Sequence, residues 1–577
     1  MVNGAIAAAF ERIADLLEIS GESAFRVNSY RRVARFLKSH TRDIAEEAAE
    51  NRLLNLPGIG QSTADKINEY LATSRMTLLT ELESKLPTGL PDLLGISSMG
   101  PKKIALVHNR LGVGSMDDLK RVIASGELAE LAGFGDQSVK KISDGIAFLE
   151  RSGGRTPLGV AMPIAEEMAA AIEKLAGVRR VAMAGSLRRG VETIGDVDLL
   201  CECDDPKNAE RIIKSFTEHP SVQGVLVRGG TKGSVIVNAG RELQVDLRVV
   251  PRESFGAALQ YFTGSKEHNV RLRELAVKRK WRLNEYGLYD GERAIAGKTE
   301  ESIYKKLGLP VIPPELREDG GEFDLTEAPE LVTESDIRGD LHMHTTASDG
   351  KCSIDEMAAA AKARGYAYIA ITDHSKSSTI ANGLSIDRMT RHIEAIREAD
   401  KRIKGIRILV GCECDILRDG AMDYPDEILA ECDVVVASIH SAMGEGSKSG
   451  ETPTHRLLKA IENRYVTIIG HATGRLLGKR PAMTIDIDQV ARAAADSGTA
   501  LEINASWQRL DLKASHVRQA IDAGAMLTID TDAHHTDSLG LIRYGLATAR
   551  RGWAKADNVL NTRSFKGVTT WIAKKRR

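Results

Sequence analysis

The feature that most constrains this chain is a series of apolar segments after residue 336, each ending in a histidine or an acidic residue. Helical stretches separate the segments, so the pattern is that of repeated strand–helix units. In such units the strands are parallel, and their carboxyl ends meet on one face. The segments are 340–344, 368–374, 408–413, 434–440, 466–471 and 527–534. This repetition predicts a parallel β/α barrel with a metal site at that face.

The residue types at these strand ends limit the metals that fit. Imidazole and carboxylate ligands together suit Mn²⁺, Zn²⁺ or Fe²⁺, and the sequence does not choose among them. Cys412 and Cys414 flank Glu413 and are alternative soft ligands, although buried reduced thiols are the expectation for all six cysteines. Four histidines lie outside the pattern and are expected to be ordinary: His392, His455, His516 and His535.

Residues 336–577 resemble the PHP (polymerase and histidinol phosphatase) family. The resemblance implies a TIM-like (β/α)7 barrel and a trinuclear metal site that hydrolyses phosphoesters. The family's ligands map to His342, His344, Asp349, His374, Glu413, His440, His471, Asp532 and His534. Every ligand position is filled by a ligand type, which favours an active hydrolase.

A second metal site is indicated in the first half of the chain. Asp196 and Asp198 lie two residues apart at the start of a strand predicted around 197–202, so their carboxylates project from one face. Like charges this close repel each other unless a cation lies between them. Asp246, on the predicted strand 243–250, would complete a site for two Mg²⁺ ions.

The segment before this pair carries groups that bind phosphate. In Gly-Ser-Leu-Arg-Arg-Gly at 185–190, Gly185 permits close backbone approach, Ser186 offers a hydroxyl, and Arg189 offers a fork of donors. A lone Asp-x-Asp pair is weak evidence. When the Asp-x-Asp pair follows such a phosphate-binding segment by about ten residues, the two together identify the nucleotidyltransferase class.

The segment Tyr-Phe-Thr-Gly-Ser-Lys-Glu-His-Asn at 261–269 narrows the class. Over about residues 1–318 the chain resembles family X DNA polymerases, the group that includes DNA polymerase beta. The resemblance implies Mg²⁺ or Mn²⁺ at the three aspartates, a sugar pocket at Tyr261 and Phe262, and a base contact from Asn269. A plain aromatic core pair is the alternative for Tyr261 and Phe262. The implied nucleotide-binding residues are Gly185, Ser186, Arg189, Tyr261, Phe262, Gly264 and Asn269.

Residues 1–150 have helical periodicity and a repeated glycine turn. Gly58 and Gly60 precede a predicted helix at 62–71, and Gly133 and Gly135 precede one at 137–149. A looser copy at 96–101 precedes a helix at 102–111. Such turns present the free N–H groups of a helix start to an anion. The repeats resemble helix-hairpin-helix motifs, which grip DNA phosphates without reading bases.

Basic runs at 26–42 and 271–282 favour further phosphate contacts, with Arg26 and Tyr30 as candidate DNA contacts, although the net charge is only −1. Lys66 matches the Schiff-base lysine with which the animal enzyme removes deoxyribose phosphate. Neighbouring family lysines are replaced by Arg26 and Ser62, which weakens the case for a lyase. A family arginine before the third aspartate is Gln244, so the environment of Asp246 is expected to differ.

The 577 residues are expected to form several domains. A proline-, glycine- and acid-rich stretch predicts a linker between the two halves. The expected divisions are a helical N-terminal domain at 1–85, helical fingers at 86–152, a nucleotidyltransferase palm at 153–252, a thumb at 253–318, a linker at 319–335 and the barrel at 336–577.

Together the halves resemble the bacterial and archaeal family X DNA polymerase with a C-terminal PHP domain. The resemblance implies template-directed filling of short gaps during base excision repair, with DNA and deoxynucleoside triphosphates as substrates. It also implies a 3′→5′ exonuclease, with cleavage at abasic sites and removal of 3′-phosphates as further candidates.

Three alternatives stay open: a metabolic phosphoesterase, a DNA-binding scaffold with inactive sites, and template-independent nucleotide transfer. The glycine turns and the segment 261–269 argue against the first, and the intact ligand sets argue against the second. No apolar run is long enough to span a membrane and the first residues lack a basic signal start, so we expect a cytoplasmic protein. We also expect a monomer.

Overall fold

The computed structural model describes residues 3–39, 44–56, 58–73, 75–87, 89–96, 99–151, 155–443 and 451–577. The chain forms two compact units, Met1–Gly153 with Gly478–Pro481, and Gly154–Leu477 with Ala482–Arg577. Within the described ranges, no helix has the length and apolar character needed to cross a membrane.

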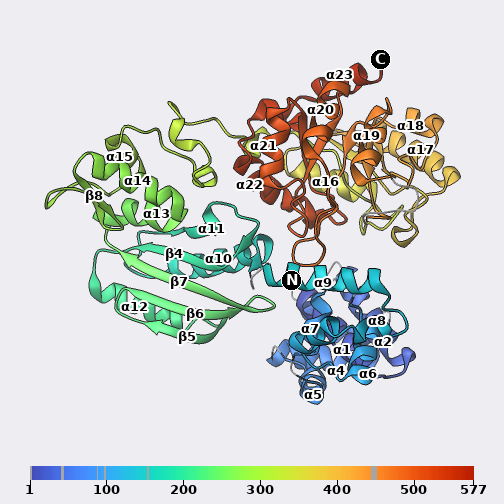
Figure 1. The fold of residues 1–577 in the computed structure, drawn as a ribbon, viewed down its shortest axis with the longest axis horizontal. Helices are drawn as coiled ribbons and strands as arrows, with labels where there is room; N and C mark the ends of the chain where they lie inside the picture. The colour runs from blue at the N-terminus through green and yellow to red at the C-terminus, as the bar shows by residue number, and fades with distance from the viewer. Residues whose placement is uncertain are drawn as a thin grey trace. The chain divides into compact units, whose positions relative to one another are not determined.

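The first unit is helical in its described part, as its periodicity predicts (Figure 1). Two apolar clusters form its core, one around α1 and α2 and the other around α6, α7 and α9. The predicted helices at 62–71, 102–111 and 137–149 correspond to α4, α6 and α9. Its elements are α1 (Asn3–Ile19), α2 (Ala24–Ser39), α3 (Ile44–Ala49), η1 (Leu53–Asn55), α4 (Gln61–Thr73), α5 (Thr77–Lys85), η2 (Pro91–Gly95), α6 (Pro101–Leu111), α7 (Met116–Ala124), α8 (Glu127–Glu130) and α9 (Asp136–Arg151).

The second unit begins with a five-stranded sheet in the order β2-β4-β7-β6-β5. Only β4 and β7 are parallel neighbours in this sheet. The strands predicted at 197–202 and 243–250 are confirmed as β4 and β7. The elements are β1 (Thr156–Pro157), α10 (Leu158–Glu173), β2 (Arg180–Met183), α11 (Gly185–Arg188), β3 (Thr193–Ile194), β4 (Asp196–Glu202), α12 (Pro206–Thr217), β5 (Val222–Arg228), β6 (Lys232–Asn238) and β7 (Glu242–Val250).

Alternation along β4 and β7 separates the core of this sheet from its site. Val197, Leu199 and Cys201 of β4 pack with the odd-numbered apolar residues of β7 against α10 and α12. The even-numbered residues, which include all three predicted aspartates, therefore lie on the opposite face, where α11 and α13 contact β4. The core also includes Leu510 and Tyr544, which come from the C-terminal barrel, and Trp507 lies so close to Gly159 that a side chain there would clash.

A small helical and three-stranded region follows, in the sheet order β10-β9-β8. The segment 319–335 after it is packed rather than extended, because Glu322 and Val332 are fully buried. The elements are η3 (Arg252–Ser254), α13 (Phe255–Thr263), α14 (Lys266–Lys278), β8 (Trp281–Asn284), β9 (Gly287–Asp290), β10 (Arg293–Ala296), α15 (Glu300–Lys306), η4 (Pro314–Leu316), η5 (Glu322–Asp324) and η6 (Glu334–Asp336).

The C-terminal part is a nearly closed barrel of seven parallel strands in sequence order, β11 to β17. A bridge between Met343 and Ala533 joins the chain beyond the first strand to the chain beyond the last. One apolar cluster fills the layer between strands and helices, and a second, covered by α23, fills the barrel interior. The strands are β11 (Gly339–Asp340), β12 (Tyr368–Ile371), β13 (Arg407–Asp415), β14 (Val434–Ser438), β15 (Ile468–Ile469), β16 (Ala500–Asn504) and β17 (Met526–Asp530).

The predicted barrel is confirmed, and β16 is the strand that the pattern of terminal ligands does not identify. The helices around the strands are α16 (Ile354–Ala363), η7 (Thr379–Ala381), α17 (Ile386–Arg402), α18 (Asp426–Glu431), α19 (Pro453–Glu462), α20 (Ile487–Ser497), α21 (Ala514–Asp522), η8 (Thr536–Leu541), α22 (Ile542–Arg551), η9 (Ala556–Asn558), η10 (Leu560–Thr562) and α23 (Phe565–Lys575).

Candidate active sites

The three palm aspartates lie together at one end of the central strand pair. Asp196 and Asp198 lie two residues apart on β4, and Asp198 is directly opposite Asp246 on the parallel strand β7. Burial, followed by the charges of Asp196 and Asp246, raises the pKa of Asp198 to about 7. This mutual repulsion is what a divalent cation would relieve, so the three side chains fit a metal site.

Asp246 has two further neighbours that adjust its carboxylate. Gln244 donates a hydrogen bond from Nε2 to Asp246 Oδ1 at 2.8 Å, and Lys232 Nζ lies 3.5 Å from Oδ2. A neutral amide therefore stands where the family has an arginine, and the cationic contact comes from β6 instead.

The segment 185–190 forms a tight turn beside these carboxylates. Gly185 has φ +62°, and a Cβ placed there would lie 2.5 Å from Asp198 Oδ2. Glycine is therefore required both by the backbone conformation and by the close approach of Asp198. The turn borders a cleft of about 410 Å³ whose lining includes Asp196, Asp198 and all seven predicted nucleotide-binding residues.

Polar contacts orient the other cleft residues. Arg189 donates from Nη1 to Thr263 O at 2.5 Å and from Nε to Glu318 Oε1 at 3.0 Å. Asn269 donates from Nδ2 to Tyr261 O at 2.7 Å, so its amide is held against the end of α13. Phe262 packs beside the apolar cluster on this face of the sheet and also lines the cleft, so it serves the core and the cavity together.

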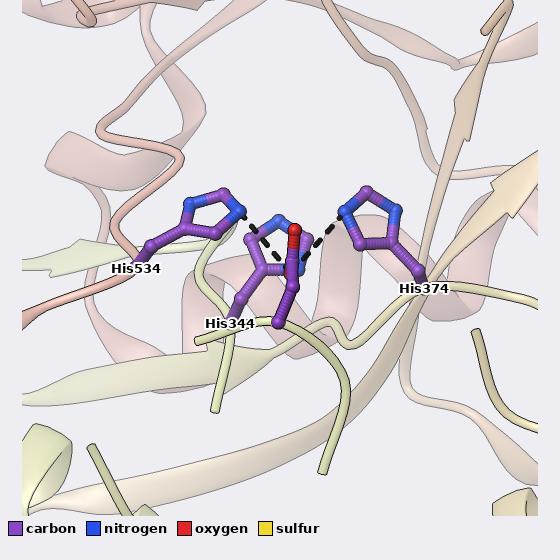
Figure 2. A group of neighbouring side chains, drawn as sticks. His344, His374 and His534 are labelled. Atoms are coloured by element: carbon purple, nitrogen blue, oxygen red, sulfur yellow. Dashed lines mark ion pairs between the residues drawn. The ribbon is translucent and has the colours of Figure 1, made fainter. Parts of the chain in front are cut away.

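All nine predicted barrel ligands converge at the carboxyl ends of the strands. Eight of them form three overlapping groups, and within each group the ligand atoms lie within 4.8 Å of one another. The ninth, His471, has its Nε2 atom 2.9 Å from Glu413 Oε1. Figure 2 shows the rings of His344, His374 and His534 turned toward a common point. The groups are His344, Asp349, His374 and His534; His342, His344 and Asp532; and His374, Glu413 and His440.

Glu413 is the centre of this arrangement. Its carboxylate lies 2.9 Å from His374 Nδ1, 3.2 Å from His440 Nε2 and 3.5 Å from His342 Nε2. Burial raises the pKa of Glu413, but these imidazoles more than compensate and hold it well below its usual range. Glu413 is thus a buried anion that several cations can share.

A ring of other side chains orients the ligands. Glu502 of β16 accepts from His342 Nδ1 at 2.6 Å, Asp415 of β13 accepts from His440 Nδ1 at 2.6 Å, and Asn504 donates to Asp532 Oδ2 at 3.1 Å. The buried Nε2 atom of His342 has no hydrogen-bond partner among the described residues. Because Nδ1 is held by Glu502, Nε2 is free to bind a cation, which fits a metal centre.

A cavity of about 370 Å³ opens onto this group, and the segment 377–381 and Arg509 also line it. His471 and Asp532 have φ values of 26° and 53°, in the left-handed region that such residues rarely adopt. The geometry suits hydrolysis of a phosphoester that enters through this opening.

The three glycine turns of the first unit share one backbone design. In each copy the same hydrogen bond closes the turn: Ile59 N to Leu56 O, Met99 N to Ile96 O, and Phe134 N to Leu131 O. Gly58 and Gly133 have φ values of 79° and 92°, and no heavy atom lies within 4 Å of a Cβ placed on Gly60 or Gly135. The helix starts are therefore accessible to an anion. Pro57, Ser97 and Ser98 of these turns lie outside the described residues.

The other predicted DNA contacts are only partly free for a ligand. Arg26 is exposed but pairs with Glu22 at 2.8 Å, and Tyr30 stacks on Phe10. Within the same basic run, Arg31 pairs with Asp15 and Glu18 of α1 and so stabilises its own domain; Arg42 lies outside the described residues. Lys66, on α4, donates to Ser62 Oγ at 2.8 Å.

Five family models match the chain in the order of these elements. They are a helix-hairpin-helix domain at residues 1–76, a SAM-like helix-hairpin-helix tandem at 90–147, the DNA polymerase beta palm at 155–232, the DNA polymerase beta thumb at 258–318 and the PHP domain at 340–506. The chain is 39% identical over 569 residues to the DNA polymerase/3′-5′ exonuclease PolX of Bacillus subtilis (strain 168), covering 97% of this chain and 98% of that protein.

This chain belongs to the PolX family. Its barrel alone has a second group of relatives, which agrees with the separate PHP match. A probable phosphatase of Thermoanaerobacter sp. (strain X514) is 32% identical over 231 residues, and one of Shewanella sediminis is 33% identical over 244 residues. These matches cover 39% and 41% of this chain, and 89% and 94% of the two phosphatases.

The residues that the sequence did not identify are mostly those that orient the ligands. Asp415 lies two residues after Glu413 on one strand face, a spacing that could have identified it. Glu502 and Asn504 had no such signal, because β16 carries no terminal histidine. His392, expected to be ordinary, donates to the buried Asp373 at 2.8 Å and so supports the loop after β12. Cys412 and Cys414 pack in the apolar layer around the barrel, away from Glu413.

Proposed function

We propose that this chain synthesises DNA at the palm and removes 3′-terminal nucleotides at the barrel, and that it fills short gaps during base excision repair. The observation that carries the proposal is the presence of two complete ligand sets in one chain. One is the aspartate group on β4 and β7, and the other is the nine-residue group at the barrel end. The polymerase and exonuclease named for the Bacillus subtilis relative support the same pairing.

At the palm, Asp196, Asp198 and Asp246 would hold Mg²⁺ or Mn²⁺, which, when bound, neutralises triphosphate charge and favours in-line attack by a primer hydroxyl. Ser186 and Arg189 bind the phosphates of the deoxynucleoside triphosphate from the loop beside the aspartates. Tyr261 and Phe262 form the wall against the sugar, where their bulk disfavours a 2′-hydroxyl.

At the barrel, the nine ligand residues would hold Mn²⁺, Zn²⁺ or Fe²⁺, which, when bound, supplies Lewis acidity for phosphodiester hydrolysis. Glu502, Asp415 and Asn504 keep the ligands oriented. The opening of about 370 Å³ has room for a terminal nucleotide rather than a duplex. The glycine turns of the first unit bind the DNA backbone without reading its sequence.

The proposal is tested on a gapped, 5′-labelled primer–template with two variants assayed for extension and shortening. Asp196→Ala should abolish extension while shortening continues, and the double substitution His342→Ala and His344→Ala should do the reverse. If Asp196→Ala also stopped shortening, or the histidine variant stopped extension, the assignment of one activity to each site would be wrong.

A small-molecule phosphatase is the second candidate for the barrel, favoured by the probable phosphatases that match it. The two are separated by offering the wild-type protein histidinol phosphate and a single-stranded DNA in parallel. Release of phosphate from the small molecule, with the DNA left intact, would favour the phosphatase. Release of nucleotides from the DNA supports the exonuclease.

A further inference from the structure

The phosphate-binding loop of the palm lies directly against a barrel helix, α22. Gly190, with φ +65°, faces Ala547 so closely that a Cβ there would lie 2.9 Å from the Ala547 Cβ. One turn later on the same helix face, Arg551 donates from Nη1 to Arg189 O at 2.9 Å. Thus α22, which follows the metal-ligand strand β17 through η8, contacts two consecutive residues of the loop.

Glu318 connects the same barrel arginine to the side chain of Arg189. Its Oε1 atom accepts from Arg551 Nη1 at 2.8 Å and from Arg189 Nε at 3.0 Å. The side chains of Arg189 and Arg551 are 14% and 17% exposed and that of Glu318 is 34% exposed, so solvent screens this three-residue network only in part. Together with Thr263 O, the network fixes Arg189 through Nε and Nη1, and none of these contacts uses Nη2.

We infer that the barrel positions the nucleotide-binding arginine of the palm: Arg551 and Glu318 hold Arg189 in the orientation that binds the triphosphate, so nucleotide affinity depends on α22. The inference rests on the proposed role of Arg189 in binding phosphate. Arg551 and Glu318 act through Arg189 and are positioning residues.

The physical reason is preorganisation. A long arginine side chain without fixed partners samples many rotamers, and ordering it during nucleotide binding weakens affinity. Without Arg551, Glu318 keeps a single arginine partner, and the carbonyl at the end of α11 loses its cationic donor. The loss should appear in the KM for nucleotide, because Arg189 binds phosphate in the ground state and in the transition state alike.

The same helix offers a matched control. Arg543 of α22 also pairs with the palm, through Glu166 of α10 at 2.8 Å, but neither residue lines the nucleotide cleft. Arg543→Ala therefore removes a barrel–palm ion pair of the same chemistry without touching the network around Arg189. The thermal midpoint of each variant reports any loss of folding.

The experiment measures KM and kcat for single-nucleotide insertion on a gapped duplex with the full chain. Arg551→Ala should raise KM about fivefold and leave kcat within about twofold, whereas Arg543→Ala should leave both unchanged. Arg551→Lys, which keeps the charge but not the fork of donors, should give an intermediate KM. Shortening of single-stranded DNA should be the same in all three.

A double-mutant cycle decides whether Arg551 acts through Arg189. Arg189→Ala should raise KM, and adding Arg551→Ala should raise it no further. Additive effects, or equal KM values for Arg551→Ala and Arg543→Ala, would overturn the inference while leaving the proposed function intact. If Arg189→Ala itself left KM unchanged, the proposed role of that residue in nucleotide binding would be the part that fails.

Discussion

In the palm, three aspartates lie on one face of a sheet beside a cleft, whereas in the barrel nine predicted ligands lie at the carboxyl ends of a ring of strands. Asp196 is exposed and Asp198 half-buried, but His342, His344 and Glu413 are almost completely buried. The palm ligands have few supporting contacts, and their charges repel one another. The barrel ligands are held by carboxylates and an amide that fix their orientation.

The difference suggests how each site obtains its specificity. The palm aspartates alone could bind many kinds of cation, so we expect the surrounding loop and the aromatic pair Tyr261 and Phe262 to select a nucleotide as the substrate. The barrel site is largely specified by its own ligands, because their number and burial leave little freedom in where cations bind. Three substitutions test this contrast, and we take them from the largest expected effect to the smallest.

The largest effect is expected at the shared barrel ligand. Glu413→Gln removes the anion that lies among His342, His374 and His440 while keeping nearly the same volume. Shortening of a labelled single strand should fall by more than about a thousandfold, since metal stabilisation of the transition state is worth several kcal/mol. Gap filling by the same preparation serves as the control. Exonuclease activity within about tenfold of wild type would show that cation binding does not depend on this carboxylate.

The second-largest effect is expected in the palm, at the close contact between Gly185 and Asp198. Gly185→Ala places a Cβ 2.5 Å from Asp198 Oδ2 in a backbone with φ +62°, so kcat for insertion should fall about a hundredfold, a cost of about 2–3 kcal/mol. Gly240→Ala is the matched control, because φ is +78° there and no heavy atom lies within 4 Å of the new Cβ. Equal losses in the two variants would mean that backbone strain, rather than contact with Asp198, is responsible.

The smallest effect is expected from a residue that orients a barrel ligand. Asp415→Asn keeps an acceptor for His440 Nδ1 but loses its charge, so the Mn²⁺ concentration giving half-maximal exonuclease activity should rise about tenfold. Asp433→Asn, which alters the carboxylate of an exposed residue that accepts a hydrogen bond from Val410 N just before β14, should leave that concentration unchanged. A tenfold increase in both variants would indicate a general loosening of the barrel.

The sequence predicted the parts of the fold that carry regular patterns. Apolar runs identified β4 and β7, and ligand-bearing strand ends identified six of the seven barrel strands. The strand β16 was missed because Glu502 and Asn504 interrupt a short apolar run and no histidine follows them. Both side chains are buried and orient other ligands, which is a property of the assembled barrel rather than of any local pattern.

Contacts between distant segments were equally beyond the sequence. The charge pattern of Arg26–Arg42 predicted a surface for phosphate, but Arg31 is engaged by Asp15 and Glu18. The composition of residues 319–335 predicted a linker, yet Glu322 is buried and accepts from His268. Charge and composition describe what a residue can bind, and only the fold decides which partner reaches it first.

The presence of Leu510 and Tyr544 in the core of the palm sheet has a practical consequence for dividing this protein. A truncation after residue 318 would remove both side chains, and Trp507 with them, leaving an apolar hollow beside Gly159. A polymerase half expressed by itself would thus expose an apolar surface and be prone to aggregation. One activity is therefore better removed by single substitutions in the whole chain than by truncation. A gene that separated the two halves during evolution would first have to replace these apolar contacts with polar residues.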